Sequence, residues 1–181
     1  MFAPIYAGNG NYLALPDDRD ATWLELDGKA ALSPLARISA VQFTLDIDLD
    51  SAIRVLNRFL GSRELLLATY PQDDIWREYV RSSAAGYRED RYGGPSQFGS
   101  LEHYCSELAS HSVVHGPALV PFDQALIWSN EDISLFIRSI WWYFRLRRYG
   151  WNLCVEVRPL ARRRDDELPI QLEQVCEIAG V

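Results

Sequence analysis

The segment AVQFTLDIDLD, residues 40–50, constrains the fold more than any other part of the chain. From residue 43 to residue 50, the odd positions carry Phe, Leu or Ile, and the even positions carry Thr or Asp. This period of two predicts a β-strand with one buried face and one solvated face. A strand that is apolar on one face needs a second layer to cover it, so the segment predicts a sheet packed against other elements.

The remaining patterns predict both helices and strands. Apolar residues at helical spacing predict helices over residues 50–61, 72–86, 100–110, 133–149 and 169–180. Strands are predicted over residues 22–28, 64–71, 124–129 and 151–159, and an N-terminal hairpin is predicted around Asn9-Gly10. The expected fold is one compact α+β domain over residues 1–181, with a mostly antiparallel sheet packed against about four or five helices.

The composition is that of a globular, acidic protein. Of the 181 residues 48% are hydrophobic, and six Trp and nine Tyr are too many for a disordered chain. Eighteen basic residues against 25 acidic ones give a net charge of −7. This balance argues against nucleic acid as a partner, because phosphate binding needs a basic surface, and it favours a basic protein.

The cysteines and the N-terminal residues bear on the expected location. Cys105, Cys154 and Cys176 are too few for a disulfide framework, which favours the cytoplasm. The first residues carry no basic region followed by an apolar run, so they do not resemble a secretion signal. Lys29 is the single lysine among the eighteen basic residues, a bias associated with GC-rich bacterial genomes. We therefore expect a bacterial cytoplasmic protein.

Residues 133–149, ISLFIRSIWWYFRLRRY, predict a helix with apolar residues on two sides. A membrane span needs roughly 20 apolar residues, and Arg138 and Arg145 interrupt the segment, so we expect no contact with a membrane. Trp142 belongs to the second apolar side, between the two arginines. Three interpretations remain open: a helix buried between two layers, an exposed Trp and Arg patch that binds a partner, and a homodimer contact.

Asp46, Asp48 and Asp50 lie on one face of the predicted strand at residues 40–50. They match the first three ligand positions of a calcium loop, but Ser51 and Asn57 stand where that loop needs glycine and glutamate. One interpretation is a solvated strand face protected by charge. The other is an acidic strip that docks a basic partner.

No constellation of catalytic, metal-binding or cofactor-binding residues has a recognisable spacing. His111 and His115 lack the glutamate of a zinc helix and would lie roughly 13 Å apart on a strand. The glycines of residues 86–100 match no phosphate-binding motif. We expect no metal and no cofactor, and we favour a protein that is not an enzyme.

Two functions follow as hypotheses. The first is a small acidic protein-binding domain that neutralises or regulates a basic partner, such as the immunity protein or antitoxin of a bacterial toxin. Its expected partner-binding residues are Asp46, Asp48, Asp50, Trp142, Arg138 and Arg145. The alternative is a small enzyme or ligand-binding domain with a pocket under the 86–100 loop. Its expected pocket residues are Tyr87, Arg88, Tyr92, His103 and Cys105.

Overall fold

The computed structural model describes residues 38–70, 72–83, 91–115, 118–125 and 140–181, with isolated positions between 24 and 35 and between 129 and 137. Its main sheet is antiparallel and has the order β1-β7-β6. The strands of this sheet are β1 (Ala40–Asp46), β6 (Phe144–Tyr149) and β7 (Asn152–Ala161). Two smaller pairs accompany it: β2 (Tyr92–Gly93) runs parallel to β5 (Trp141–Trp142), and β3 (Val113–His115) is antiparallel to β4 (Ala118–Val120).

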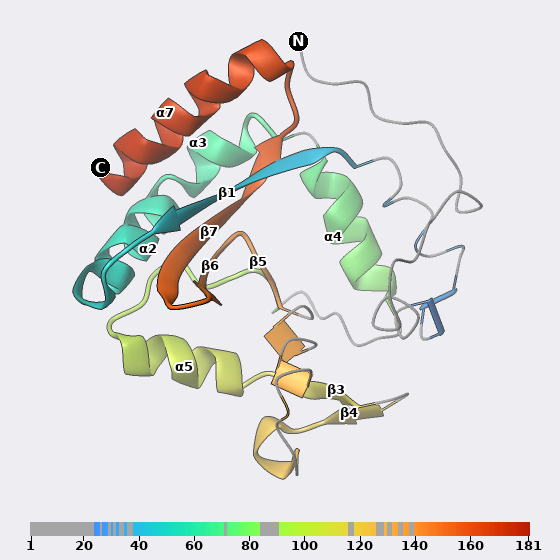
Figure 1. Ribbon diagram of the computed structural model, residues 1–181. Helices are drawn as coiled ribbons and strands as arrows, with labels where there is room; N and C mark the ends of the chain where they lie inside the picture. The colour runs from blue at the N-terminus through green and yellow to red at the C-terminus, as the bar shows by residue number, and fades with distance from the viewer. Residues whose placement is uncertain are drawn as a thin grey trace.

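Helices cover the sheet. They are α2 (Ala52–Gly61), α3 (Arg63–Leu67), α4 (Asp73–Ser82), α5 (Leu101–Ala109) and α7 (Leu168–Ala179). Figure 1 shows α2, α3 and α7 on one side of β1 and β7, and α4 on the other. The predicted α+β class and the antiparallel main sheet are confirmed.

The main core lies where α2 meets β6 and β7. Phe59 of α2 stacks on Phe144 of β6 with ring centroids 5.5 Å apart, and both side chains are fully buried. Val155 and Val157 of β7 complete this surface with no exposed area. Fully burying side chains of this size stabilises the fold by about 1.5–3 kcal/mol each.

The strand predicted at residues 40–50 is confirmed as β1 for its first part. Phe43 and Leu45 are half-buried against the core, while Thr44 and Asp46 are exposed. The chain then leaves the sheet, and Leu49–Ser51 form a 3₁₀ helix, η3. The predicted helices at residues 50–61, 72–86, 100–110 and 169–180 are also found, as α2, α4, α5 and α7.

The helix predicted over residues 133–149 is wrong for its second half. Ile137 is helical, but Trp141 to Tyr149 belong to β5 and β6, with Tyr143 between the strands. The reason is cross-strand pairing: Arg145 lies opposite Glu156 of β7 and forms an ion pair with it. A helical wheel cannot detect this partner, and a short run that is apolar on both sides fits a buried strand as well as a helix.

Two predicted strands are also wrong, and others cannot be compared. Residues 64–67 belong to α3 and residues 68–69 to the turn that follows it, and the described residues of 22–28 are helical. Short apolar runs do not distinguish strand from helix, and Leu66 of α3 is buried like a core residue of either type. The N-terminal hairpin and residues 126–128 of the strand predicted at 124–129 lie outside the described residues, while Gln124 ends the 3₁₀ helix η5 (Phe122–Gln124).

Candidate functional site

A groove of about 800 Å³ opens at the end of β1. Its walls are the end of β1 with η3, the outward side of α2, the loop between β6 and β7, and the C-terminal end of α7. The end of α7 and α2 lie side by side (Figure 1), and the Arg58 guanidinium of α2 donates a hydrogen bond to the carbonyl of Ala179. We call this feature the acidic groove, because Asp46 and Asp48 line one wall of it.

The three predicted acids lie at this end of β1 but do not form one strand face. Asp46 and Asp48 line the groove, whereas Asp50 is an exposed residue of η3 and is not among the residues that line it. The Asp46 carboxylate accepts hydrogen bonds from Asn152 Nδ2 at 2.7 Å and from Cys154 Sγ at 3.0 Å. Asp46 is therefore anchored to β7, while the side chains of Asp48 and Asp50 face solvent.

The Cys154 thiol is buried, contacts Asp46 and is chemically inert. It is only 1% exposed. Burial, followed by the hydrogen bond and negative charge of Asp46, raises the pKa of the Cys154 thiol to about 11. The thiol therefore remains protonated at neutral pH and serves as a hydrogen-bond donor rather than as a nucleophile.

Trp151 is the residue at the groove that sequence reasoning missed. Its side chain is 92% exposed, and it lines the groove, as Asp48 does. The pairing of Tyr149 with Asn152 makes Gly150 and Trp151 a two-residue hairpin loop, in which Gly150 has a φ of +60°. Glycine is favoured at the first position of such a loop because it adopts a positive φ without strain, and Trp151 follows as the second loop residue. The signal in the sequence was the Tyr-Gly-Trp-Asn run between two strands.

Two further apolar side chains and two cations surround the acids. Leu49 of η3 is 62% exposed and Val181 is 79% exposed, and both line the groove. Arg54 and Arg58 of α2 lie on the same wall, with Arg58 tied to α7. The groove therefore combines exposed apolar anchors with charges of both signs.

Trp142 and Arg145 do not form the predicted exposed patch. Trp142 is 1% exposed and packs against both Phe98 and Tyr104, with its ring centroid 5.5 Å from each of theirs. Arg145 is buried, and its Nε donates to Glu156 Oε2 at 2.5 Å. The prediction that these two residues contact a partner is wrong for this reason, and Arg138 lies outside the described residues.

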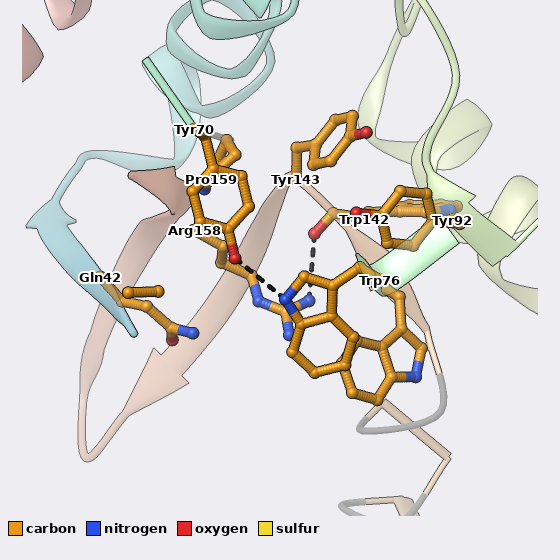
Figure 2. Close-up of a pocket in the computed structure, with 10 residues that line it drawn as sticks. Gln42, Tyr70, Trp76, Tyr92, Trp142, Tyr143, Arg158 and Pro159 are labelled. Carbon is orange, nitrogen blue, oxygen red and sulfur yellow. Dashed lines mark hydrogen bonds between the residues drawn. The ribbon is translucent and has the colours of Figure 1, made fainter. Parts of the chain in front are cut away.

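The residues of the predicted alternative pocket do not converge. Tyr92 of β2 lines a cavity between the sheet and α4 (Figure 2). His103 of α5 is half exposed and lies 3.3 Å from Glu107, while Cys105 lines a separate apolar hollow with Phe122. Tyr87 and Arg88 lie outside the described residues.

The described part of the chain also bears on metal binding and on membranes. There, no three His, Cys, Asp or Glu residues gather as a metal site would require. None of the helices in that part has the length and apolar character to cross a membrane. Comparison of the chain with models of protein families, with curated proteins and with solved structures finds no match.

Proposed function

We propose that the protein is an acidic protein-binding domain that neutralises or regulates a basic partner, which it holds in the acidic groove. The observation that carries this proposal is Trp151, an almost fully exposed tryptophan that a tight hairpin loop presents at the wall of a groove. A tryptophan buries about 150–250 Å² when it is covered, which corresponds to about 4–6 kcal/mol of apolar burial. Tryptophan is also the residue type most enriched at energetic centres of interfaces.

The exposed acids at the end of β1 support a partner with basic side chains, while the cation beside Trp151 itself is Arg148, 5.2 Å from the ring centroid. Asp48 and Asp50 are exposed beside Leu49, and the whole chain carries a net charge of −7. Opposite charge raises the rate of encounter, and the apolar anchors then slow dissociation. Arg54 on the α2 wall of the groove selects against a partner that is uniformly basic and favours one with an acidic group among its cations.

More specifically, we propose that the protein is an immunity protein or antitoxin in the bacterial cytoplasm. A toxin that attacks nucleic acid needs a basic surface, and an acidic partner that covers this surface blocks the attack. No catalytic constellation was found in the sequence, which is consistent with a protein that acts by occupying a surface.

The test is a pull-down from the native host at low and high salt with four baits besides the wild type. Trp151→Ala and the double variant Asp48→Lys/Asp50→Lys alter the groove. Glu64→Lys reverses an exposed charge on α3, and Ile170→Ala removes an exposed apolar side chain at the start of α7. These two controls lie outside the groove.

We expect one basic protein to bind the wild type and both controls, and to be lost from both groove variants. High salt should weaken this binding, because the steering charges are exposed. Trp151→Ala should reduce affinity by at least 30-fold, since a hot-spot residue contributes about 2 kcal/mol or more. Equal capture by groove variants and controls would refute the groove as the binding surface. If light scattering shows that the protein self-associates, the occupant of the groove would be a second copy of this chain and not a basic partner.

A further inference from the structure

A small cavity between the sheet and α4 has the features of an anion site. It measures about 50 Å³ and is bounded by Gln42 of β1, Arg158 of β7, Tyr70, Trp76 of α4 and Trp141 of β5. Figure 2 shows the Arg158 guanidinium extending between Gln42 and Trp76, with the Tyr70 hydroxyl directed toward it. The cavity is separate from the acidic groove and shares no lining residue with it.

The cation of Arg158 has no close carboxylate partner among the described residues, and it lies over the Trp141 ring at 5.6 Å from the centroid. Its Nη1 donates to the carbonyls of Trp142 at 3.1 Å and of Ile140 at 3.5 Å. Its Nε is buried without a hydrogen-bond acceptor and lies 3.8 Å from Glu156 Oε2. No hydrogen bond from Nη2 is formed within the described part of the chain, and this nitrogen faces the cavity.

The nearby carboxylates are committed to other cations. Glu156 accepts a direct hydrogen bond from Arg145 at 2.5 Å, so two arginines share one carboxylate. Asp73 is paired with Arg77 at 2.7 Å. Each of these two carboxylates thus has its own nearest cation, and among the described residues Arg158 shares Glu156 at a longer distance, which leaves part of its positive charge uncompensated there.

Arg158 is still charged at neutral pH. Burial, together with the cation of Arg145, lowers the pKa of Arg158 to about 10. Tyr70 adds a second donor: its oxygen accepts from Trp76 Nε1 at 2.9 Å, which leaves its hydroxyl proton without an acceptor among the described residues. Burial raises the pKa of Tyr70 to about 12, so this proton is retained.

The volume limits the size of the anion. One water-sized group needs about 10–15 Å³ of such space, so the cavity accepts roughly three or four heavy atoms. Formate and acetate have this size, and their planar oxygens suit the guanidinium of Arg158. The rings of Trp76 and Trp141, with centroids 4.1 Å apart, form an apolar wall beside the charged group.

We propose that this cavity binds a small carboxylate, whose oxygens accept hydrogen bonds from Arg158 Nη2 and the Tyr70 hydroxyl. A carboxylate placed there neutralises the uncompensated charge of Arg158 and satisfies two donors at once. The low dielectric of the cavity strengthens both bonds relative to water. A neutral amide of the same shape gains neither charge neutralisation nor a charge-assisted bond.

The experiment is a titration of the full chain with sodium formate and sodium acetate. Trp76 and Trp141 provide a fluorescence signal at the site, and thermal unfolding measures stabilisation by the ligand. Sodium chloride at equal ionic strength, acetamide and sodium phosphate serve as comparison solutes. We expect saturable binding in the millimolar range for formate and acetate only.

Two variants and one matched control test the residues. Tyr70→Phe should weaken acetate binding about tenfold, because a hydrogen bond to a charged group is lost. Gln42→Glu places a fixed carboxylate at the exposed edge of the cavity and should abolish the response to acetate. Gln97→Glu makes the same change at an exposed residue away from the cavity and should bind acetate like the wild type.

Three outcomes would overturn the proposal. The first is an equal effect of chloride or acetamide, which would show that no carboxylate is recognised. The second is an equal effect of phosphate, which would indicate a general anion surface. The third is identical acetate binding by Gln42→Glu and Gln97→Glu.

Discussion

Replacing Glu156 by Gln should destabilise the protein by about 3–5 kcal/mol at pH 7. The Glu156 side chain is 7% exposed, and it faces the cations of Arg145 at 2.5 Å and Arg158 at 3.8 Å. At an effective dielectric of about 20, each unit charge about 4 Å away contributes about 4 kcal/mol. The sum over two arginines is reduced by the several kcal/mol that burial of the carboxylate costs. Gln has nearly the same shape as Glu and keeps one acceptor oxygen, so the loss in free energy of unfolding reports the contribution of the charge.

The matched control is Asp166→Asn. Asp166 accepts two hydrogen bonds from Arg164, at 3.0 and 2.9 Å, but both side chains are more than half exposed. Exposed pairs of this kind contribute about 0–1 kcal/mol. Urea unfolding followed by tryptophan fluorescence gives the free energy of unfolding for the wild type and both variants.

The pH dependence adds an independent criterion. Burial alone would raise the pKa of Glu156, but the cations of Arg145 and Arg158 outweigh it and hold the pKa below its ordinary value of 4.5. A carboxyl with a lowered folded-state pKa stabilises the protein above its unfolded-state pKa, and this contribution is lost as pH falls through the lowered value. The gap between wild type and Glu156→Gln should therefore narrow below about pH 4.5. Equal losses in Glu156→Gln and Asp166→Asn, or a gap independent of pH, would refute this reasoning.

Two further predictions concern the end of α7 and the thiols. Gly180→Ala should cost about 1–2 kcal/mol or more, because Gly180 has a φ of +77° and an added Cβ would clash with Arg58 Nη1. The control Gly61→Ala meets open space in α2 and should be neutral or stabilise by up to about 1 kcal/mol. Equal effects of the two substitutions in urea unfolding would contradict the argument. A thiol reagent at pH 8 should label exposed Cys105 in the native protein and Cys154 only after unfolding, and simultaneous labelling of both would show that Cys154 is accessible.

The elements with a local signal could be predicted from the sequence. Alternation at residues 43–46 marks β1 because its apolar face is set by neighbours two positions apart. The helix α7 has Pro169 in its first turn and Gly180 at its C-cap, with the left-handed φ that such a cap requires. These signals depend on residues close in the chain, so no tertiary information was needed.

The features with a distant partner could not be predicted. β6 is a strand because Arg145 meets Glu156 across the sheet, and its own residues fit a helix equally well. Trp151 is exposed because the register of β6 and β7 places it in the loop. The cavity at Arg158 is assembled from segments between Ala40 and Pro159, so its uncompensated charge has no signature within any one segment.

The pairing of β1 with β7 has a consequence for synthesis of the chain on the ribosome. Ala40 pairs with Ala161, so β1 emerges well before the strand that completes its hydrogen bonds. At about 5–20 residues per second, the delay is on the order of ten seconds. During this time the Asp46 carboxylate lacks Asn152 and Cys154, and the hairpin loop that presents Trp151 does not exist. The acidic groove is therefore incomplete on a nascent chain, and it forms only when β7 has joined the sheet.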